Sequence, residues 1–265
     1  MQYQTVLKKM MTELNDVVHY YLDVENDVLN LNQLVGRELE ISFEGYQCLC
    51  CGKEKKIFRQ GFCYDCFYES AAVGDWIMNP ELSRAHLGIE DRDLAYEKEV
   101  QLKPHIVYLA LSSNVKVGVT RKTQVPTRWI DQGATKAIEI VEVPNRYLAG
   151  ITEVALKKYV ADKTNWQKML KNEVLEADLI EEREKLKEYI PKEAQPYFLG
   201  NNGKVTEIEY PVVQYPTKIK SLNLDKTPVY NGKLIGIKGQ YLLFEDGIVF
   251  NVRNNEGYKV IITIN

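Results

Sequence analysis

The chain has 265 residues, of which 45% are hydrophobic and 27% charged, as in an ordinary folded protein of one large domain or two to three small ones. Its net charge of −3 excludes a highly basic nucleic-acid coat protein. No apolar run reaches the roughly 18 residues of a membrane-spanning helix, and Lys8, Lys9 and Glu13 interrupt any N-terminal signal core. We therefore expect a cytoplasmic protein without a membrane partner.

Residues 1–46 contain two strand-like stretches. Residues 17–22 are rich in β-branched and aromatic side chains, and residues 40–43 alternate polar and apolar side chains. We predict a small N-terminal β-unit over residues 1–46.

Four of the five cysteines form two Cys-x-x-Cys pairs, Cys48 with Cys51 and Cys63 with Cys66, inside residues 47–69. Each pair fits a tight turn, and two such turns can surround one tetrahedral Zn²⁺ with bonds of about 2.3 Å. In a reducing cytoplasm such pairs are more often metal sites than disulfides, which are the alternative. Four thiolates leave no open position for a substrate, so we predict a structural zinc ribbon.

The fifth cysteine, one histidine and three lysines lie near the cysteine pairs in the sequence. We expect Cys50 to be a small buried side chain that does not bind the metal. His86, in an acidic connector over residues 70–103, leaves Cys₃His ligation as a minor alternative. Three lysines of the ribbon are either phosphate contacts or solvated turn residues: Lys53, Lys55 and Lys56.

A basic segment follows the connector. Residues 101–171 carry 12 Lys and Arg against 5 Asp and Glu, a charge of +7, which leaves −10 for the rest of the chain. Such asymmetry indicates local binding of a polyanion. Within it the patterns predict strands over 105–111, 115–121 and 137–143, a helix around 127–129 and a second helix over 147–159. We expect a β-β-α-β-α core over residues 104–172.

The C-terminal part changes from helix to strand. Residues 173–190 predict a helix ended by Pro191, inside a linker over 173–195 whose charges form a solvated face. Residues 196–265 predict a small antiparallel β-domain with strands over 211–213, 241–244, 248–252 and 259–262. Its turn signals are Asn231-Gly232, Asp246-Gly247 and Glu256-Gly257. The fold class is therefore α+β.

The β-β-α-β-α order and its residues resemble the GIY-YIG nuclease fold. Ile106-Val107-Tyr108 stands where that superfamily has G-I-Y, and Lys116-Val117-Gly118 stands where it has Y-I-G. The string Lys116-Val117-Gly118-Val119-Thr120 is closer to a phage-type branch that has K-I-G-x-T. The chain departs from the superfamily pattern in two places, with Ile106 for the first glycine and Lys116 for the second tyrosine.

The resemblance implies a phosphodiesterase that depends on a divalent metal ion. Arg128 would contact phosphate, Glu153 would hold Mg²⁺ or Mn²⁺, and Tyr108 would position or deprotonate the nucleophile. Phosphodiester hydrolysis needs each of these: a metal ion, a cation on the phosphate and a base. Lys116 occupies the second base position, where a reference pKa of about 10.4 makes lysine a poor base unless burial lowers it.

Further basic and aromatic residues would extend a phosphate-binding face. Arg121 and Lys122 adjoin Lys116, and Trp129 beside Arg128 could stack a base or belong to the core. The alternatives for the proposed site residues are ordinary ones. Tyr108 would be a core tyrosine, and Glu153 a solvated helix glutamate.

Over nearly all of its length the chain resembles an uncharacterised bacterial group, domain-of-unknown-function family 2797. The shared strings are Cys63-Tyr64-Asp65-Cys66, Lys116 to Arg121, Arg128 to Ala134, Asp162 to Trp166 and Gly236 to Tyr241. This resemblance implies an architecture rather than an activity.

These patterns together predict a zinc-containing protein that interacts with DNA or RNA, with metal-dependent phosphodiester hydrolysis as its activity. One alternative is a non-catalytic nucleic-acid-binding module, whose binding would be salt-sensitive and independent of Mg²⁺. The other is a zinc-stabilised scaffold that contacts a protein partner through the ribbon or the C-terminal β-domain.

Overall fold

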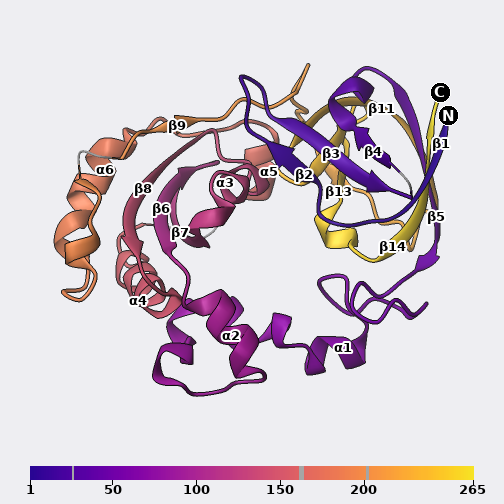
Figure 1. Ribbon diagram of the computed structural model, residues 1–265. Coiled ribbons are helices and arrows are strands. Elements are labelled where there is room, and N and C mark those ends of the chain that lie inside the picture. Colours follow the sequence, from indigo (N-terminus) through magenta and orange to yellow (C-terminus); the bar gives the residue numbers. More distant parts are fainter. Residues whose placement is uncertain (26, 161–163, 201–202) are drawn as a thin grey trace. The chain divides into compact units, whose positions relative to one another are not determined.

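The chain divides into two compact units in the computed structural model, which describes residues 1–25, 27–160, 164–200 and 203–265 (Figure 1). Unit 1 comprises Met1–Tyr68 and Ile208–Asn265, and unit 2 comprises Glu69–Glu207. The structure thus differs from the six-segment division, because the N-terminal β-region, the cysteine region and most of the C-terminal β-region share one unit. Asp162 and Lys163 of the family-like string lie outside the described residues.

Unit 1 is built on a seven-stranded sheet in the order β1-β14-β5-β11-β12-β13-β10. All neighbours are antiparallel except β10, which runs parallel to β13. The strands are β1 (Gln2–Val6), β5 (Glu38–Tyr46), β10 (Lys220–Ser221), β11 (Val229–Lys238), β12 (Tyr241–Phe244), β13 (Ile248–Asn251) and β14 (Tyr258–Ile264).

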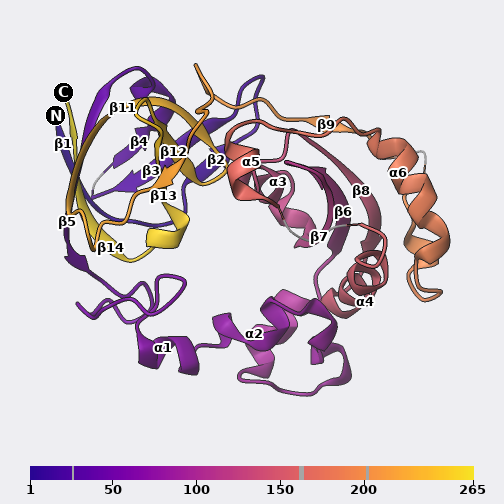
Figure 2. The same ribbon diagram turned by 180° about the vertical axis from the view of Figure 1, so that it is seen from behind.

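The two ends of the chain meet in this sheet. Strand β5 lies between β14 and β11, so an N-terminal strand is enclosed by two C-terminal ones. Strand β1 pairs with β14, and the Met1 amino group donates to the Ile264 carbonyl at 3.0 Å. Figures 1 and 2 both show the termini side by side. The expected N-terminal and C-terminal β-domains are one sheet.

A second, three-stranded sheet in unit 1 comprises β2 (Met11–Glu13), β3 (His19–Val24) and β4 (Asp27–Asn30), and the short helix η1 (Leu31–Leu34) follows it. Alternate residues of β3 are buried, as expected for a strand with one face on the core. The interior is apolar and includes Leu7, Leu22, Leu39, Ile41, Leu242, Phe250 and Val260.

The turn signals of unit 1 were only partly correct. Asp246-Gly247 joins β12 to β13, and Glu256-Gly257 precedes β14. Asn231-Gly232, however, lies inside β11, where Gly232 pairs with Leu39 of β5. The expected strand over 211–213 contains only an isolated bridge between Val212 and Gly236.

Unit 2 is built on a four-stranded antiparallel sheet in the order β7-β6-β8-β9. The five elements expected over residues 104–172 are present in the expected order, and β9 and α5 are additional. The elements are α2 (Leu94–Gln101), β6 (His105–Leu111), β7 (Val115–Arg121), α3 (Thr127–Asp131), β8 (Lys136–Val143), α4 (Arg146–Leu156), α5 (Trp166–Leu170), α6 (Leu179–Leu186) and β9 (Thr206–Glu207).

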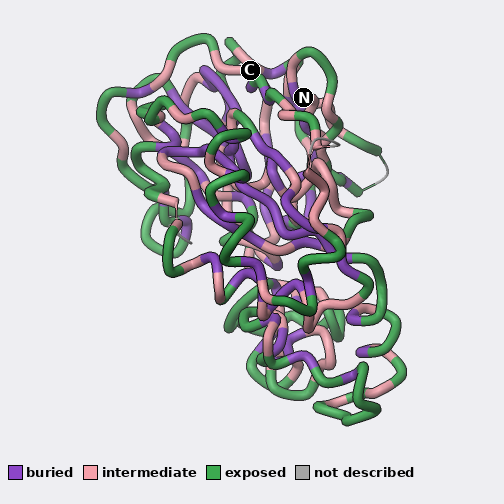
Figure 3. The backbone as a smooth tube through the Cα atoms, turned by 90° about the vertical axis from the view of Figure 1, so that its left-hand side faces the viewer, coloured by how far each residue is buried: buried purple, intermediate pink, exposed green. Residues whose placement is uncertain are grey.

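Helices cover both faces of this sheet. Val107, Leu109 and Leu111 of β6 share a core with α4 and α6. The alternate residue Tyr108 points to the other face, where it contacts Trp129 of α3. Figures 1 and 2 show α3 and α6 on opposite sides of the sheet, and Figure 3 shows the buried stretches that run along the strands. Every residue of β6 is therefore buried.

The segment expected to be a solvated linker helix is part of this core. Helix α6 begins at Leu179, because the Asp178 side chain caps it by accepting from the Ile180 and Glu181 amides. Leu179 and Leu186 are buried among residues of β8. Among the described residues, no helix is long and apolar enough to cross a membrane.

Gly150 of α4 lies against the backbone of η4 (Pro80–Leu82), and a Cβ there would be 2.1 Å from the Glu81 nitrogen. Alanine normally stabilises a helix interior by about 1 kcal/mol relative to glycine. Because backbone cannot give way cheaply, we expect Gly150→Ala to lower the free energy of unfolding of unit 2 by about 1–3 kcal/mol instead. Urea unfolding followed by tryptophan fluorescence measures this, since all three tryptophans lie in unit 2.

Val154→Ala is the matched control, because Val154 lies on the same helix and is 39% exposed. It should change the free energy of unfolding by no more than about 0.5 kcal/mol. A gain in stability for Gly150→Ala would contradict the close contact.

Candidate metal centre and arginine cluster

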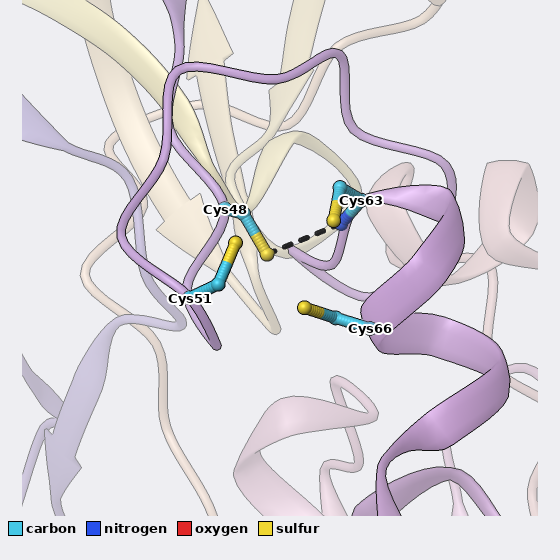
Figure 4. Close-up of side chains that lie close together, drawn as sticks. All are labelled: Cys48, Cys51, Cys63 and Cys66. Atoms are coloured by element: carbon cyan, nitrogen blue, oxygen red, sulfur yellow. Dashed lines mark hydrogen bonds between the residues drawn. The ribbon is translucent and has the colours of Figure 1, made fainter.

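The sulfur atoms of Cys48, Cys51, Cys63 and Cys66 lie within 4.8 Å of one another (Figure 4). Figure 4 shows two side chains from the loop after β5 and two from the start of α1 (Tyr64–Glu69), all directed toward a common centre. A tetrahedral Zn²⁺ with bonds of about 2.3 Å has sulfur edges of about 3.8 Å. The four cysteines therefore fit a single zinc ion with little movement.

Hydrogen bonds shape the first cysteine turn. The Cys48 carbonyl accepts from the Gly52 amide at 2.9 Å, and Gly52 has a φ of +68° that suits glycine. Gln47, just before the turn, donates its amide to the Gly257 carbonyl at 2.8 Å. The turn is thereby attached to the end of β5 and to the start of β14.

A hairpin and a helix form the second half of the site. Gln60 and Gly61 both have positive φ, at 53° and 75°, in the turn of a short hairpin that a bridge between Arg59 and Phe62 closes. The Cys63 amide then donates to the Cys48 sulfur at 3.2 Å. This contact stabilises the thiolate form of Cys48.

The pKa values of two of the thiols, Cys48 and Cys66, shift in opposite directions. Burial opposes ionisation of Cys48, yet backbone N–H groups of Cys51, Cys63 and Cys50 lower the pKa of its thiol to about 6. Burial and hydrogen bonds to the neighbouring sulfurs raise the pKa of Cys66. A bound cation would allow all four groups to be thiolates, with release of protons.

The other residues named near the two cysteine pairs differ in exposure and partners. Cys50 is exposed, so the expectation of a buried thiol was wrong; its side chain acts on Cys66 without belonging to the four-sulfur cluster. His86 belongs to unit 2 and stacks on Tyr147 with centroids 4.6 Å apart, so the cluster in the described residues is made of cysteines alone. Lys55 is paired with Asp65 at 2.6 Å. Lys53 and Lys56 are exposed.

Tyr108 lies at the centre of the second candidate site, in unit 2. It is fully buried, and its hydroxyl donates to Gln132 Oε1 at 3.0 Å. Its cross-strand partner on β7 is Gly118, where a Cβ would be 2.7 Å from the Tyr108 hydroxyl. Burial raises the pKa of Tyr108, although the Arg128 guanidinium lowers it. Trp129 is 3% exposed and its ring centroid lies 6.0 Å from that of Tyr108, as a core residue would.

Glu153 is 8% exposed on α4 and therefore not a solvated glutamate. Burial raises the pKa of its carboxyl group, while Lys157 and Arg146 lower it. Lys157 Nζ lies 3.6 Å from Glu153 Oε2. The charge of Glu153 also raises the pKa of Tyr108, so the two groups interact electrostatically.

Arg146 is a residue that sequence analysis missed, and with Arg121 and Arg128 it forms what we call the arginine cluster. It donates to the carbonyls of Trp76 at 3.0 Å and Ile77 at 2.7 Å. Burial lowers the pKa of Arg146 to about 10. The charge of Glu153 raises this pKa, and the charges of Arg121 and Arg128 lower it further. Two signals in the sequence pointed to it: Arg146 lies in the basic segment over residues 101–171, and a cation in the first turn of a helix is unfavourable to the helix dipole.

The other candidate residues have separate surroundings. Lys116 is 5% exposed on β7. Lys122 pairs with Glu142 at 2.7 Å, which neutralises it. Arg121 lies opposite His105 in the β6–β7 ladder. Arg121 also acts electrostatically on Arg146, as do Arg128 and Glu153, and the last two act on Tyr108 as well.

A model of one protein family matches residues 36–260, and its description is "Protein of unknown function (DUF2797)". The match covers most of both units and includes the four cysteines and the arginine cluster. Neither the curated proteins nor the solved structures contain a match to the chain.

We expect one zinc ion per chain in reduced, folded protein, measured by elemental analysis. Cys48→Ser should abolish stoichiometric zinc and lower the thermal stability of unit 1, because a structural zinc site contributes directly to folding. Cys50→Ser is the matched control, since Cys50 lies two residues away and outside the cluster. Equal zinc content in both variants would contradict the site.

His105 should make the stability of unit 2 depend on pH. Burial lowers its pKa to about 4, with Arg146 and Arg121 contributing, while the unfolded value is about 6.5. As the pH falls, the unfolded state therefore takes up a proton at His105 before the folded state does. The free energy of unfolding decreases as the pH drops from 6.5 toward 4. Between pH 7 and pH 5 we expect a loss of about 2 kcal/mol from this group.

The measurement is urea unfolding by tryptophan fluorescence at several pH values. His105→Gln should flatten the profile in this window, whereas His86→Gln, at an exposed position in the same unit, should keep it. An unchanged slope for His105→Gln would show that another group is responsible.

Proposed function

We infer that this chain, which belongs to the protein family of unknown function DUF2797, is a zinc-stabilised protein that binds nucleic acid. The four-cysteine cluster supports the zinc, since it offers ligands of the right kind at compatible distances. We assign the zinc a structural role, which is to hold the ribbon against the rest of unit 1, because a tetrathiolate site has no open position for chemistry.

The observation that carries nucleic-acid binding is the arginine cluster of unit 2. Arg121 and Arg128 both act electrostatically on Arg146, so three guanidinium groups share one region. Positive charges held close together repel one another, and a bound phosphate group would offset this repulsion. Arg146 is engaged by backbone carbonyls, whereas Arg121 and Arg128 are only partly buried and can contact a ligand.

Phosphodiester hydrolysis by a GIY-YIG-like core is the finer proposal. It is supported by the electrostatic coupling of Tyr108 to both Arg128 and Glu153, the three groups to which the superfamily resemblance assigns roles. Glu153 would hold Mg²⁺ or Mn²⁺, with Glu81 as the nearest further carboxylate acting on it. The cytoplasm is the compartment in which we propose that it acts.

Two observations favour binding without hydrolysis as the second candidate function. Tyr108 is fully buried and hydrogen-bonded to Gln132, so its hydroxyl does not face solvent. Lys116, in place of the superfamily's second tyrosine, is buried as well. Both candidates use the same arginines, and they differ in whether Glu153 and a metal ion matter.

Arg128→Ala should weaken binding of DNA or RNA and reduce the salt dependence of the binding constant by about one counterion, as expected when one phosphate contact is lost. Fluorescence anisotropy over a salt series measures both quantities. Lys122→Ala is the matched control, because its charge is already neutralised by Glu142. Absence of any binding by wild-type protein at low salt would overturn the proposed function.

Glu153→Gln decides between the two candidates. With labelled single-stranded, duplex and branched substrates, hydrolysis predicts cleavage in Mg²⁺ or Mn²⁺ that EDTA and Glu153→Gln abolish, because the metal loses its carboxylate. Binding alone predicts no cleavage by either protein and retention by both. Glu176→Gln, at an exposed glutamate of the same unit, should behave as wild type.

A further inference from the structure

Four aromatic rings cluster on the ribbon, and the zinc site does not require them. Phe58 contacts Tyr64 and Phe67 with ring centroids 5.2 Å apart in each pair, and Tyr64 and Tyr68 lie 4.8 Å apart. Tyr68 also contacts Phe58 at 5.9 Å and Phe67 at 5.5 Å. We call Phe58, Tyr64, Phe67 and Tyr68 the ribbon aromatic cluster.

The ribbon aromatic cluster is open to solvent. Phe58 is 40% exposed, Tyr64 60% and Tyr68 53%, although rings that serve only a core are normally buried. Tyr64 and Tyr68 are four residues apart on α1 and so share one helix face. Among the described large hydrophobic residues, every exposed one between positions 47 and 69 is aromatic. The surface thus offers rings without aliphatic side chains.

Basic side chains also lie in this segment. The Arg59 guanidinium lies 5.3 Å from the centre of the Phe58 ring. Of the three acidic residues in the ribbon, Glu54 is engaged by Lys259 and Asp65 by Lys55, both at 2.6 Å, and Glu69 stands at the end of α1. Lys55 also faces the charge of the cysteine site, which helps to raise its pKa after the larger effect of Asp65. Two lysines and the arginine are left for a ligand: Lys53, Lys56 and Arg59.

The size of the surface distinguishes between kinds of partner. At these exposed fractions the three rings present on the order of 300 Å². A standard protein interface buries about 800 Å² on each partner, so this patch alone is too small for a stable dimer or protein complex. It is large enough for two or three nucleotide bases, which stack on aromatic rings and arginine. In a duplex these base faces are already covered.

We propose that the ribbon aromatic cluster and Arg59 form a stacking site for unpaired bases of single-stranded nucleic acid, with Lys53 and Lys56 as phosphate contacts. The proposal rests on the proposed function, since it specifies the class of nucleic acid that the protein recognises. It uses residues of unit 1 alone, so it can fail while binding by the arginine cluster of unit 2 stands. The zinc site would then position the rings rather than contact the ligand.

The test is fluorescence anisotropy with full-length, zinc-loaded protein and oligothymidylate of about 20 nucleotides, compared with a duplex of equal length. Tyr64→Ala/Tyr68→Ala should weaken binding of the single strand by about tenfold or more and change duplex binding by less than about twofold. Tyr64→Phe/Tyr68→Phe keeps the rings and should retain wild-type affinity. Equal zinc content in all proteins shows that the ribbon remains folded.

Tyr197→Ala is the matched control, since Tyr197 is a tyrosine of unit 2 that is 39% exposed. Unchanged single-strand affinity in the double alanine variant would overturn the stacking site and leave the proposed function intact. Failure of the wild-type protein to bind either probe would overturn both the stacking site and the proposed function. A wild-type dimer in sedimentation that the alanine variant abolishes would also overturn the inference, because the rings would then be an interface between copies of this chain.

Discussion

Complete burial of strand β6 is the constraint on which the chemistry of unit 2 depends. All seven of its residues are buried because β7 and β8 pair with its edges and helices cover its two faces. A titratable group on such a strand loses its hydration and favours its neutral form. His105 accordingly has a lowered pKa and Tyr108 a raised one, and both groups are neutral near pH 7. Positive charge in this region therefore resides on the surrounding arginines, while burial of Glu153 raises the pKa of its carboxyl group.

That distribution of charge explains why phosphate recognition is a better-supported role than proton transfer. A buried, neutral tyrosine beneath Trp129 can position its neighbours through its hydrogen bond to Gln132. Its side chain has no exposed surface in this structure. Arg146 keeps its charge at neutral pH, although burial lowers its pKa to about 10. Anion recognition requires such a charge but no proton transfer.

In unit 1 the corresponding constraint is the attachment of the ribbon to the main sheet. A Cβ on Gly257 would be 2.6 Å from the Ile57 side chain, and one on Gly61 would be 2.5 Å from Leu49. These close contacts and the ion pair of Lys259 with Glu54 hold the cysteine turns at the end of β5 and the start of β14. The arrangement puts the thiols around a common centre and leaves the aromatic side chains of α1 outside. One small element can therefore bind a metal ion and display rings.

Local patterns determined the elements of the basic core and the candidate metal ligands. The runs at His105–Leu111 and Val115–Arg121 are strands at the expected residues, because a buried or alternating apolar run is a property of neighbouring positions. The spacing of the four cysteines likewise needs only two turns, and it predicted their cluster. Helix α4 ended three residues earlier than expected, which is the usual uncertainty at a helix end.

Only the tertiary structure decided what depends on distant partners. Asn231-Gly232 has the composition of a turn, yet pairing with β5 keeps it in a strand. Helix α6 has the charges of a linker, yet Leu179 and Leu186 are drawn into the core beside β8. Strand β1 and its pairing with β14 join residues about 260 positions apart, which no local pattern specifies. By itself the sequence determined the strands and helices of residues 105–156 and the cluster of four cysteines. Long-range pairing and burial decided the strands of unit 1, the neighbours of each element and hence the ionisation of His105 and Tyr108.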